Sequence, residues 1–255
     1  MESIADRARR LAVLIDAENA SPTVLRGLFE EVASFGEAVV RRVYGDFSGS
    51  RLRGWTEGLA AHGLVPHQTF ALAAGKNAAD IALVVDAMDL LHTGRFDGFC
   101  LVSSDSDFTR LASRIREQGL DVYGFGERKT PASFRNACRR FLYTENLANP
   151  SQTAGAGAST SQPSPDTAAK LPPEAAVPHI VLALRQLEDA DGWYPLAAVG
   201  ARLAALLPDF DTRSYGSARL LGLVERSCAF EVRREGLRVL VRHLGETAAG
   251  QLGRA

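Results

Sequence analysis

The chain has 255 residues, a formal net charge of −1 and 46% hydrophobic residues. These values indicate a globular protein of one large or two modest domains, and they exclude a strong global field that would by itself attract nucleic acid or a membrane surface. The three cysteines are scattered, as expected of reduced structural thiols in a cytoplasmic protein, and no apolar run approaches the length of a membrane span.

The first half of the chain alternates predicted strands and helices. Apolar runs predict strands over 11–15, 38–44, 64–71, 98–103, 120–125 and 141–143. Helical spacing predicts helices after Ser21-Pro22 and over 51–61, 78–92, 108–118 and 132–139. This alternation is typical of an α/β fold with a mostly parallel sheet and helices on both faces.

The composition changes at 148–173, where the chain is small, polar and proline-rich. Such a segment cannot bury enough apolar surface to offset its ordering entropy, so we expect a flexible linker. The linker separates an N-terminal domain, 10–147, from a C-terminal module, 174–243.

The C-terminal module is predicted to be a winged helix-turn-helix. Helices are expected from Pro178, over 196–207, and from a cap at Thr212, with Tyr215 and Val224 on the apolar face of the third. Alternating residues in 230–234 and 237–242 surround Glu235-Gly236, which indicates a β-hairpin.

Acidic residues follow the predicted strands of the first domain. Asp16 ends the first strand, and Asp105 and Asp107 end the strand at 98–103. Asp80 lies in the first turn of the long helix at 78–92. Each could simply belong to a helix start, and Asp107 or Ser106 could cap the helix that follows it. Together, however, they bring like charges to one sheet edge, which is costly unless a cation joins them.

This donor set favours Mg²⁺ or Mn²⁺, because the ligands are hard oxygens with no histidine or cysteine nearby. Such an ion suits phosphodiester hydrolysis, since it can activate a water and offset phosphate charge. Asn19 could bind a metal water or orient Asp16. Ser103, Ser104 and Lys76 could contact a substrate phosphate, although Lys76 could equally be a solvated loop residue.

Other charged residues are weaker candidates. Asp86 and Asp89 point away from Asp80 on the helical wheel, so we expect them to face solvent or to pair with an arginine. Two sets of basic residues could contact RNA, and we place the second close to the acidic edge: Arg41, Arg42, Arg51 and Arg53; and Arg128, Lys129, Arg135, Arg139 and Arg140.

Three segments resemble the NYN domain, the LabA-like branch of the PIN-like ribonucleases. They are Leu-Ile-Asp-Ala-Glu-Asn at 14–19, Gly-Lys-Asn-Ala-Ala-Asp at 75–80 with the apolar helix after it, and Leu-Val-Ser-Ser-Asp-Ser-Asp-Phe at 101–108. The resemblance implies a PIN-like three-layer sandwich with a mainly parallel sheet. It also implies metal-dependent RNA cleavage by acids at the positions of Asp16, Asp80, Asp105 and Asp107, with Asn19 nearby. Many family members carry an Asp or a Gly in place of Glu18, so the role of Glu18 stays open.

The C-terminal module is similar to the OST-HTH or LOTUS domain. The similarity rests on Leu-Pro-Asp-Phe-Asp-Thr-Arg-Ser-Tyr-Gly at 207–216, on Leu220 and on the strand at 230–232. This family is associated with RNA binding and recurs beside NYN domains. The charge of the module is near zero, so a protein partner is a second interpretation.

The sequence as a whole predicts a cytoplasmic, divalent-metal-dependent endoribonuclease with an RNA-targeting module, as a monomer or a homo-oligomer. One alternative is a non-catalytic RNA-binding regulator on an inactive nuclease fold. Another is a phosphatase of the haloacid dehalogenase type, which would need a second Asp where this chain has Glu18.

Overall fold

The computed structural model describes residues 7–70, 77–147, 170–188 and 191–245, and the chain divides into two compact units at 1–161 and 162–255. Most of the predicted linker lies outside the described residues, and so does Lys76. Each unit is a structure in its own right and is described separately.

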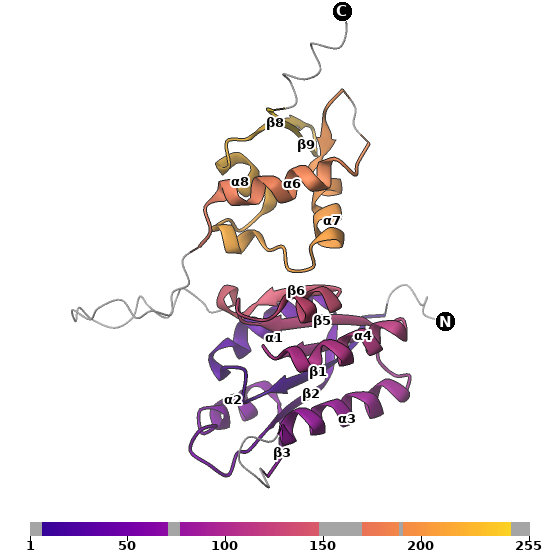
Figure 1. The fold of residues 1–255 in the computed structure, drawn as a ribbon, viewed down its shortest axis with the longest axis vertical. Coiled ribbons are helices and arrows are strands. Elements are labelled where there is room, and N and C mark those ends of the chain that lie inside the picture. Colours follow the sequence, from indigo (N-terminus) through magenta and orange to yellow (C-terminus); the bar gives the residue numbers. More distant parts are fainter. Residues whose placement is uncertain (1–6, 71–76, 148–169, 189–190, 246–255) are drawn as a thin grey trace, which may run out of the picture. The chain divides into compact units, whose positions relative to one another are not determined.

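The first unit contains one six-stranded sheet in the order β3-β2-β1-β4-β5-β6 (Figure 1). All neighbouring strands are parallel, so their carboxyl ends meet at one edge. The strands are β1 (Arg10–Asp16), β2 (Glu37–Gly45), β3 (Val65–Gln68), β4 (Gly98–Val102), β5 (Asp121–Gly126) and β6 (Arg140–Tyr143).

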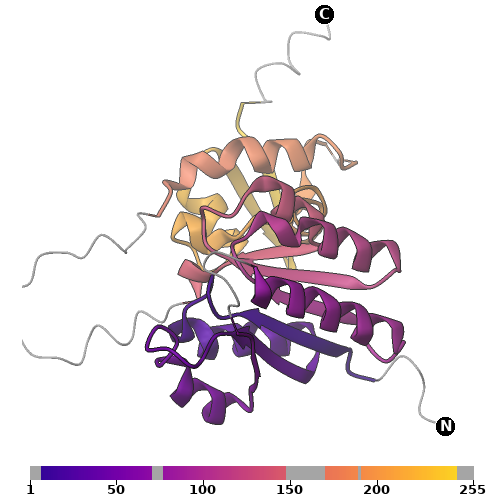
Figure 2. The same ribbon diagram turned by 60° about the horizontal axis from the view of Figure 1, so that its bottom comes forward.

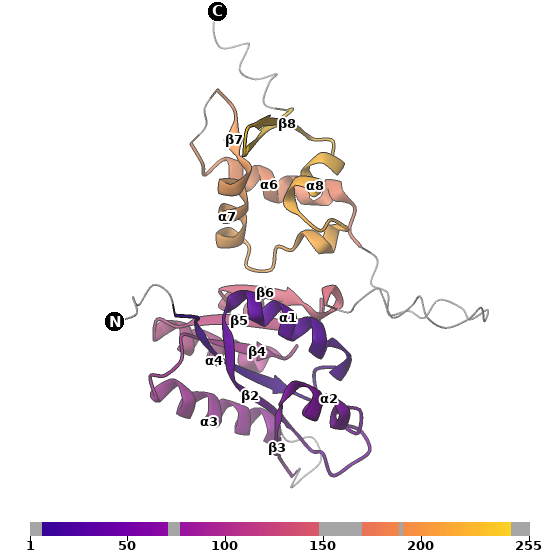
Figure 3. The same ribbon diagram turned by 180° about the vertical axis from the view of Figure 1, so that it is seen from behind.

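Helices cover both faces of this sheet. They are α1 (Leu25–Phe35), α2 (Trp55–His62), α3 (Ala78–His92), α4 (Thr109–Glu117) and α5 (Ala132–Ala137). Helices α3 and α4 lie on one face (Figure 1) and α1 and α2 on the other (Figure 3). The three-layer α/β fold predicted from the sequence is therefore confirmed.

Side chains along each buried strand point alternately to the two faces of the sheet, and this produces two separate cores. In β1, Ala12 and Leu14 join the core under α3, α4 and α5, whereas Leu11, Val13 and Ile15 join the core under α1 and α2. Both sets are fully buried, which explains why this strand is a continuous apolar run.

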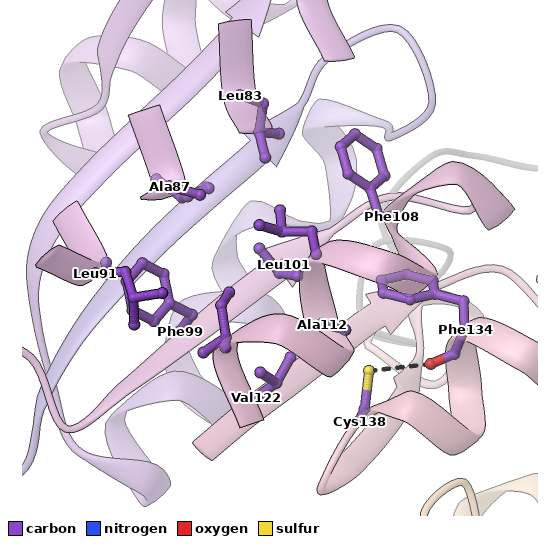
Figure 4. Close-up of a cluster of buried hydrophobic side chains, with 14 of the residues drawn as sticks. Leu83, Ala87, Leu91, Phe99, Leu101, Phe108, Ala112, Val122, Phe134 and Cys138 are labelled. Atoms are coloured by element: carbon purple, nitrogen blue, oxygen red, sulfur yellow. Dashed lines mark hydrogen bonds between the residues drawn. The ribbon is translucent and has the colours of Figure 1, made fainter. Parts of the chain in front are cut away.

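Helix α3 packs against β1 and β2, and its buried side chains belong to the core beneath α3 and α4. Figure 2 shows the ribbon of the same layers from another side. Leu83 and Ala87 of α3 pack in this core with Phe99 and Leu101 of β4 (Figure 4). The Cys138 thiol is buried in the same core and donates to the Phe134 carbonyl at 3.3 Å. This packing fixes the position of the first turn of α3 relative to the sheet edge.

The second unit has a single core and a three-stranded sheet in the order β7-β9-β8. Its helices are α6 (Val177–Leu184), α7 (Leu196–Leu206) and α8 (Leu220–Arg226), and its strands are β7 (Tyr194–Pro195), β8 (Phe230–Glu235) and β9 (Arg238–His243). The predicted hairpin is confirmed by the antiparallel pairing of β8 with β9.

The prediction of one continuous third helix in this module is wrong. A 3₁₀ turn at Thr212–Tyr215 ends at Gly216, whose φ of 72° is left-handed, and α8 begins only at Leu220. The cap is also different, because the Asp211 side chain rather than Thr212 accepts the first backbone N–H, from Arg213.

Candidate functional site

Asp16 lies at the carboxyl end of β1 with only 1% of its surface exposed. Its Oδ2 accepts hydrogen bonds from Asn19 Nδ2 and Ser103 Oγ, each at 2.8 Å, and its Oδ1 accepts the Glu18 backbone N–H at 3.0 Å. These neutral donors orient the carboxylate without cancelling its charge. Two roles were considered for Asn19, binding a metal-bound water and orienting Asp16, and the hydrogen bond from Asn19 to the Asp16 carboxylate corresponds to the second.

The loop after β4 is built around its own hydroxyl and carboxyl groups. Asp105 caps the 3₁₀ turn Ser106–Phe108 by accepting the Asp107 N–H at 2.9 Å, so among the candidate caps in this run the structure selects Asp105 and not Ser106 or Asp107. Ser103 Oγ accepts the Asp105 N–H at 3.1 Å, and Ser104 Oγ accepts the N–H of Glu127 at 2.9 Å. Ser103 therefore joins the Asp105 backbone to the Asp16 carboxylate.

Asp80 reaches the same edge from the first turn of α3. Asn77, the residue before that helix, donates from Nδ2 to Asp107 Oδ2 at 3.3 Å and ties the helix start to the loop after β4. Burial raises the pKa of Asp80 to about 6, with further contributions from the charges of Asp16, Asp105, Glu18 and Asp107. Three aspartates from two other segments therefore act electrostatically on Asp80, and we call Asp16, Asp80, Asp105 and Asp107 the acidic edge.

Two residues at the edge have roles that the sequence left unassigned. Glu18 carries its carboxylate 3.6 Å from the guanidinium of Arg51, so it faces the segment that follows β2. Asn77 is the other: it lies within the segment at 75–80 that resembles the NYN domain, but its partner could not be read from the sequence, because the contact with Asp107 depends on where α3 docks.

Asp86 pairs with Arg42, which confirms one of the two alternatives for this residue. It also accepts a hydrogen bond from Tyr44, and His67 Nδ1 lies 3.9 Å from its carboxylate. Burial opposes the charge, but hydrogen bonds from Tyr44 and Arg42 hold the pKa of Asp86 below its usual value. Asp89 is exposed.

The expected arginine track is only partly at the acidic edge. Arg139 and Arg140 stand at the start of β6, and Arg139 binds Asp121 at the start of β5, so both lie at the opposite edge of the parallel sheet. Arg135 donates to the hydroxyl of Tyr143 near the carboxyl end of β6. The prediction placed Arg139 and Arg140 near the acids because they follow the fifth strand in the sequence. The chain crosses to the opposite edge of the sheet before β6 begins, so these arginines lie at the amino-terminal ends of the strands.

The donor chemistry of the acidic edge fits a hard divalent cation, since every candidate ligand is a carboxylate or amide oxygen. Within the residues that the structure describes, however, no group of three or more His, Cys, Asp or Glu side chains is close enough to hold a metal ion. The edge is thus compatible with a cation bound by one or two carboxylates and water, which is how Mg²⁺ is usually held.

Comparisons with known proteins agree with this architecture. The family model of the NYN domain matches residues 10–146, and that of the OST-HTH/LOTUS domain matches residues 173–241. NYN domains belong to a nuclease superfamily, and LOTUS domains are associated with RNA binding. None of the helices in the described ranges has the length and apolar character needed to cross a bilayer.

Solved structures add only weak similarity. A protein of unknown function from Vibrio parahaemolyticus is 23% identical over 55% of this chain and 94% of its own, with a TM-score of 0.45. MurG of Acinetobacter baumannii is 13% identical over 86% of this chain and 70% of its own, with a TM-score of 0.35. No curated protein matches the chain significantly. On the family-model matches, the chain belongs to the NYN domain family and carries an OST-HTH/LOTUS domain after its NYN domain.

Proposed function

We propose that the NYN domain is a divalent-metal-dependent endoribonuclease and that the LOTUS domain directs it to RNA. The observation that carries the proposal is the convergence of four aspartates on one sheet edge, where burial and the neighbouring acids together raise the pKa of Asp80 to about 6. Uncompensated carboxylates of this kind are unfavourable in a purely structural role, and a cation would relieve their repulsion.

Each residue of the edge has a role in this proposal. Asp16, held by Asn19 and Ser103, presents a carboxylate in one fixed orientation. Asp105 is fixed through its cap, and Asp80 supplies a carboxylate whose charge is disfavoured by burial and by the acids around it. When bound, Mg²⁺ or Mn²⁺ would offset the charge of the scissile phosphate and lower the pKa of a water. Contact of Ser103, Ser104 or Lys76 with substrate stays a prediction.

The test is cleavage of labelled single-stranded RNA by the full chain in Mg²⁺ or Mn²⁺. We expect endonucleolytic products that EDTA abolishes and that Asp105→Asn reduces by at least 100-fold, on the order of a lost electrostatic or metal-ligand group. Asp89→Asn is the matched control, because Asp89 is exposed on α3 and outside the edge. Cleavage that persists in EDTA, or that is unchanged in Asp105→Asn, would refute the assignment.

A second candidate is a non-catalytic RNA-binding protein. It is favoured by one observation, that the described residues contain no preformed cluster of metal ligands. RNA retention without cleavage in any divalent cation would support it. The NYN match argues against the phosphatase alternative, as does Glu18, which faces Arg51.

A further inference from the structure

A cavity of about 350 Å³ lies between the segment that joins β2 to α2 and strand β3 (Figure 3 shows these elements). Its apolar wall includes Phe47, Leu59 and Pro66, and its polar side includes Arg53 and Thr56. This volume is at the lower end of the ~300–1,000 Å³ typical of small-molecule pockets. A site of this size suits one flat ring system with an attached polar group.

The cavity and the acidic edge lie at the ends of neighbouring strands. Strand β2 pairs with β1 and runs parallel to it, so the segment after β2 begins beside the end of β1. The Ala17 N–H donates to the Tyr44 carbonyl at 2.9 Å, which extends this pairing past Asp16. Farther along, Arg51 meets Glu18 across the same junction. An extended strand that crosses the acidic edge would therefore follow this junction toward the cavity.

The wall that carries Phe47 is held in place by its own hydrogen bonds. Gln68 of β3 accepts the Phe47 backbone N–H at 3.0 Å and donates to Asp46 Oδ1 at 2.8 Å. Asp46 Oδ1 also accepts the Ser48 N–H at 3.0 Å. The partly buried Phe47 ring is thus presented by a preorganised segment.

One cationic group, Arg53, lines the cavity and is available to an anionic ligand. Arg53 is exposed, and among the described residues no carboxylate lies within ion-pair distance of its guanidinium. By contrast, the nearby Arg51 pairs with Glu18. Asp46 accepts hydrogen bonds from the neutral groups of Ser48 and Gln68, which orient its carboxylate away from an ion pair with Arg53 but leave it charged. An aromatic ring beside an unpaired guanidinium is the combination that single-stranded nucleic acids use, through base stacking and phosphate contact.

We propose that this cavity binds one nucleotide of the RNA strand, next to the nucleotide at the acidic edge. The base stacks against Phe47, and its phosphate contacts Arg53. The site gives the strand a fixed register relative to the carboxylates. The proposal rests on the proposed function, because it assumes that RNA crosses the acidic edge.

The test measures RNA binding apart from cleavage, with the full chain in EDTA. Fluorescence anisotropy follows a short single-stranded RNA and a series of the same RNA with one abasic nucleotide at each position. We expect Phe47→Ala to weaken binding of intact RNA by about 5- to 150-fold, the usual range for loss of one stacked base. Arg53→Gln should weaken binding and lower the slope of log affinity against log salt by about one. Removing the base at one position of the RNA should weaken binding to the wild-type protein but should not weaken binding to Phe47→Ala any further.

Two variants at the opposite edge are the matched controls. Phe35→Ala removes a partly buried aromatic ring from the same core, and Arg95→Gln removes an exposed arginine near the start of β4. Both should bind like wild type. Arg53→Gln keeps the test decisive if Phe47→Ala folds poorly, because the Arg53 side chain is exposed.

Crosslinking locates the contact independently of affinity. RNA containing 4-thiouridine, irradiated with the full chain in EDTA, should crosslink within 46–66. Unchanged binding of both cavity variants, with crosslinks confined to other segments, overturns the proposal. If RNA binds through this cavity but is not cleaved in Mn²⁺, the nuclease assignment fails and the cavity stands. If RNA is cleaved in Mn²⁺ but both cavity variants bind it like wild type, the nuclease assignment stands and the cavity proposal fails.

Discussion

Replacing Asp80 with asparagine should stabilise the metal-free protein. The pKa of Asp80 is raised to about 6 by burial and by the neighbouring acids, from an ordinary value of 3.8. The folded state therefore binds the proton more tightly than the unfolded state, and the wild type loses stability as the pH rises from about 4 to about 6. Asparagine has the same shape and no charge, so it escapes this penalty at neutral pH.

The magnitude follows from the shift. Two pKa units correspond to at most about 3 kcal/mol, and we halve this value because Asp80 is only partly buried and solvent screens its charge. The expected gain for Asp80→Asn is about 1–2 kcal/mol at pH 7.5, or roughly 3–8 °C in Tm for a domain of this size. At pH 4 the two proteins should unfold at nearly the same temperature.

The assay is thermal unfolding of the full chain in EDTA at both pH values, followed by calorimetry of the NYN transition. Asp89→Asn, on the exposed face of the same helix, is the control and should match wild type. Added Mn²⁺ should reverse the order, since a ligand that binds the folded state at 100 times its Kd stabilises by about 2.7 kcal/mol and Asp80→Asn would lose part of that gain. An equal or lower Tm for Asp80→Asn at pH 7.5 in EDTA would refute the electrostatic account of the edge.

Three further substitutions test the supporting structure through urea midpoints in EDTA. Ser103→Ala should cost about 1–3 kcal/mol, because the buried Asp16 carboxylate loses a donor at 2.8 Å; a neutral effect would contradict this. Gly126→Ala should cost about 1–3 kcal/mol, since its Cβ would lie 2.6 Å from a backbone carbonyl oxygen, whereas Gly49→Ala, with nothing within 4 Å, is the neutral control. Asp86→Ala should cost about 1–3 kcal/mol by leaving its arginine and tyrosine partners unpaired, and retained stability would show that this network is dispensable.

Local patterns in the sequence were sufficient for the order of strands and helices in the first unit. The apolar run that contains Ile15 ends at Asp16 in both the prediction and the structure, and α3 spans Ala78–His92 as its periodicity predicts. Strand–helix alternation also implied a parallel sheet, and a parallel sheet gathers its strand ends at one edge. The convergence of Asp16 with Asp105 followed from that rule.

Predictions that depended on which ends and side chains meet were less successful. Arg139 was placed near the acids but lies at the opposite edge, because β6 begins there and runs parallel to β5. The identity of the cap after β4 was left open by the sequence, since Asp105 and Ser106 are both good caps and only backbone geometry selects Asp105.

Tertiary structure alone decided the contacts between distant segments. Asp86 finds Arg42 and Tyr44, and Asn77 finds Asp107, only because α3 docks on β1 and β2 at one position. The cavity beside Phe47 likewise depends on how β3 and the segment before α2 pack together. Periodicity and caps encode interactions a few residues apart, and the sequence therefore determined the elements and their sheet edge. Contacts across thirty or more residues depend on strand order and helix docking, which no local pattern specifies.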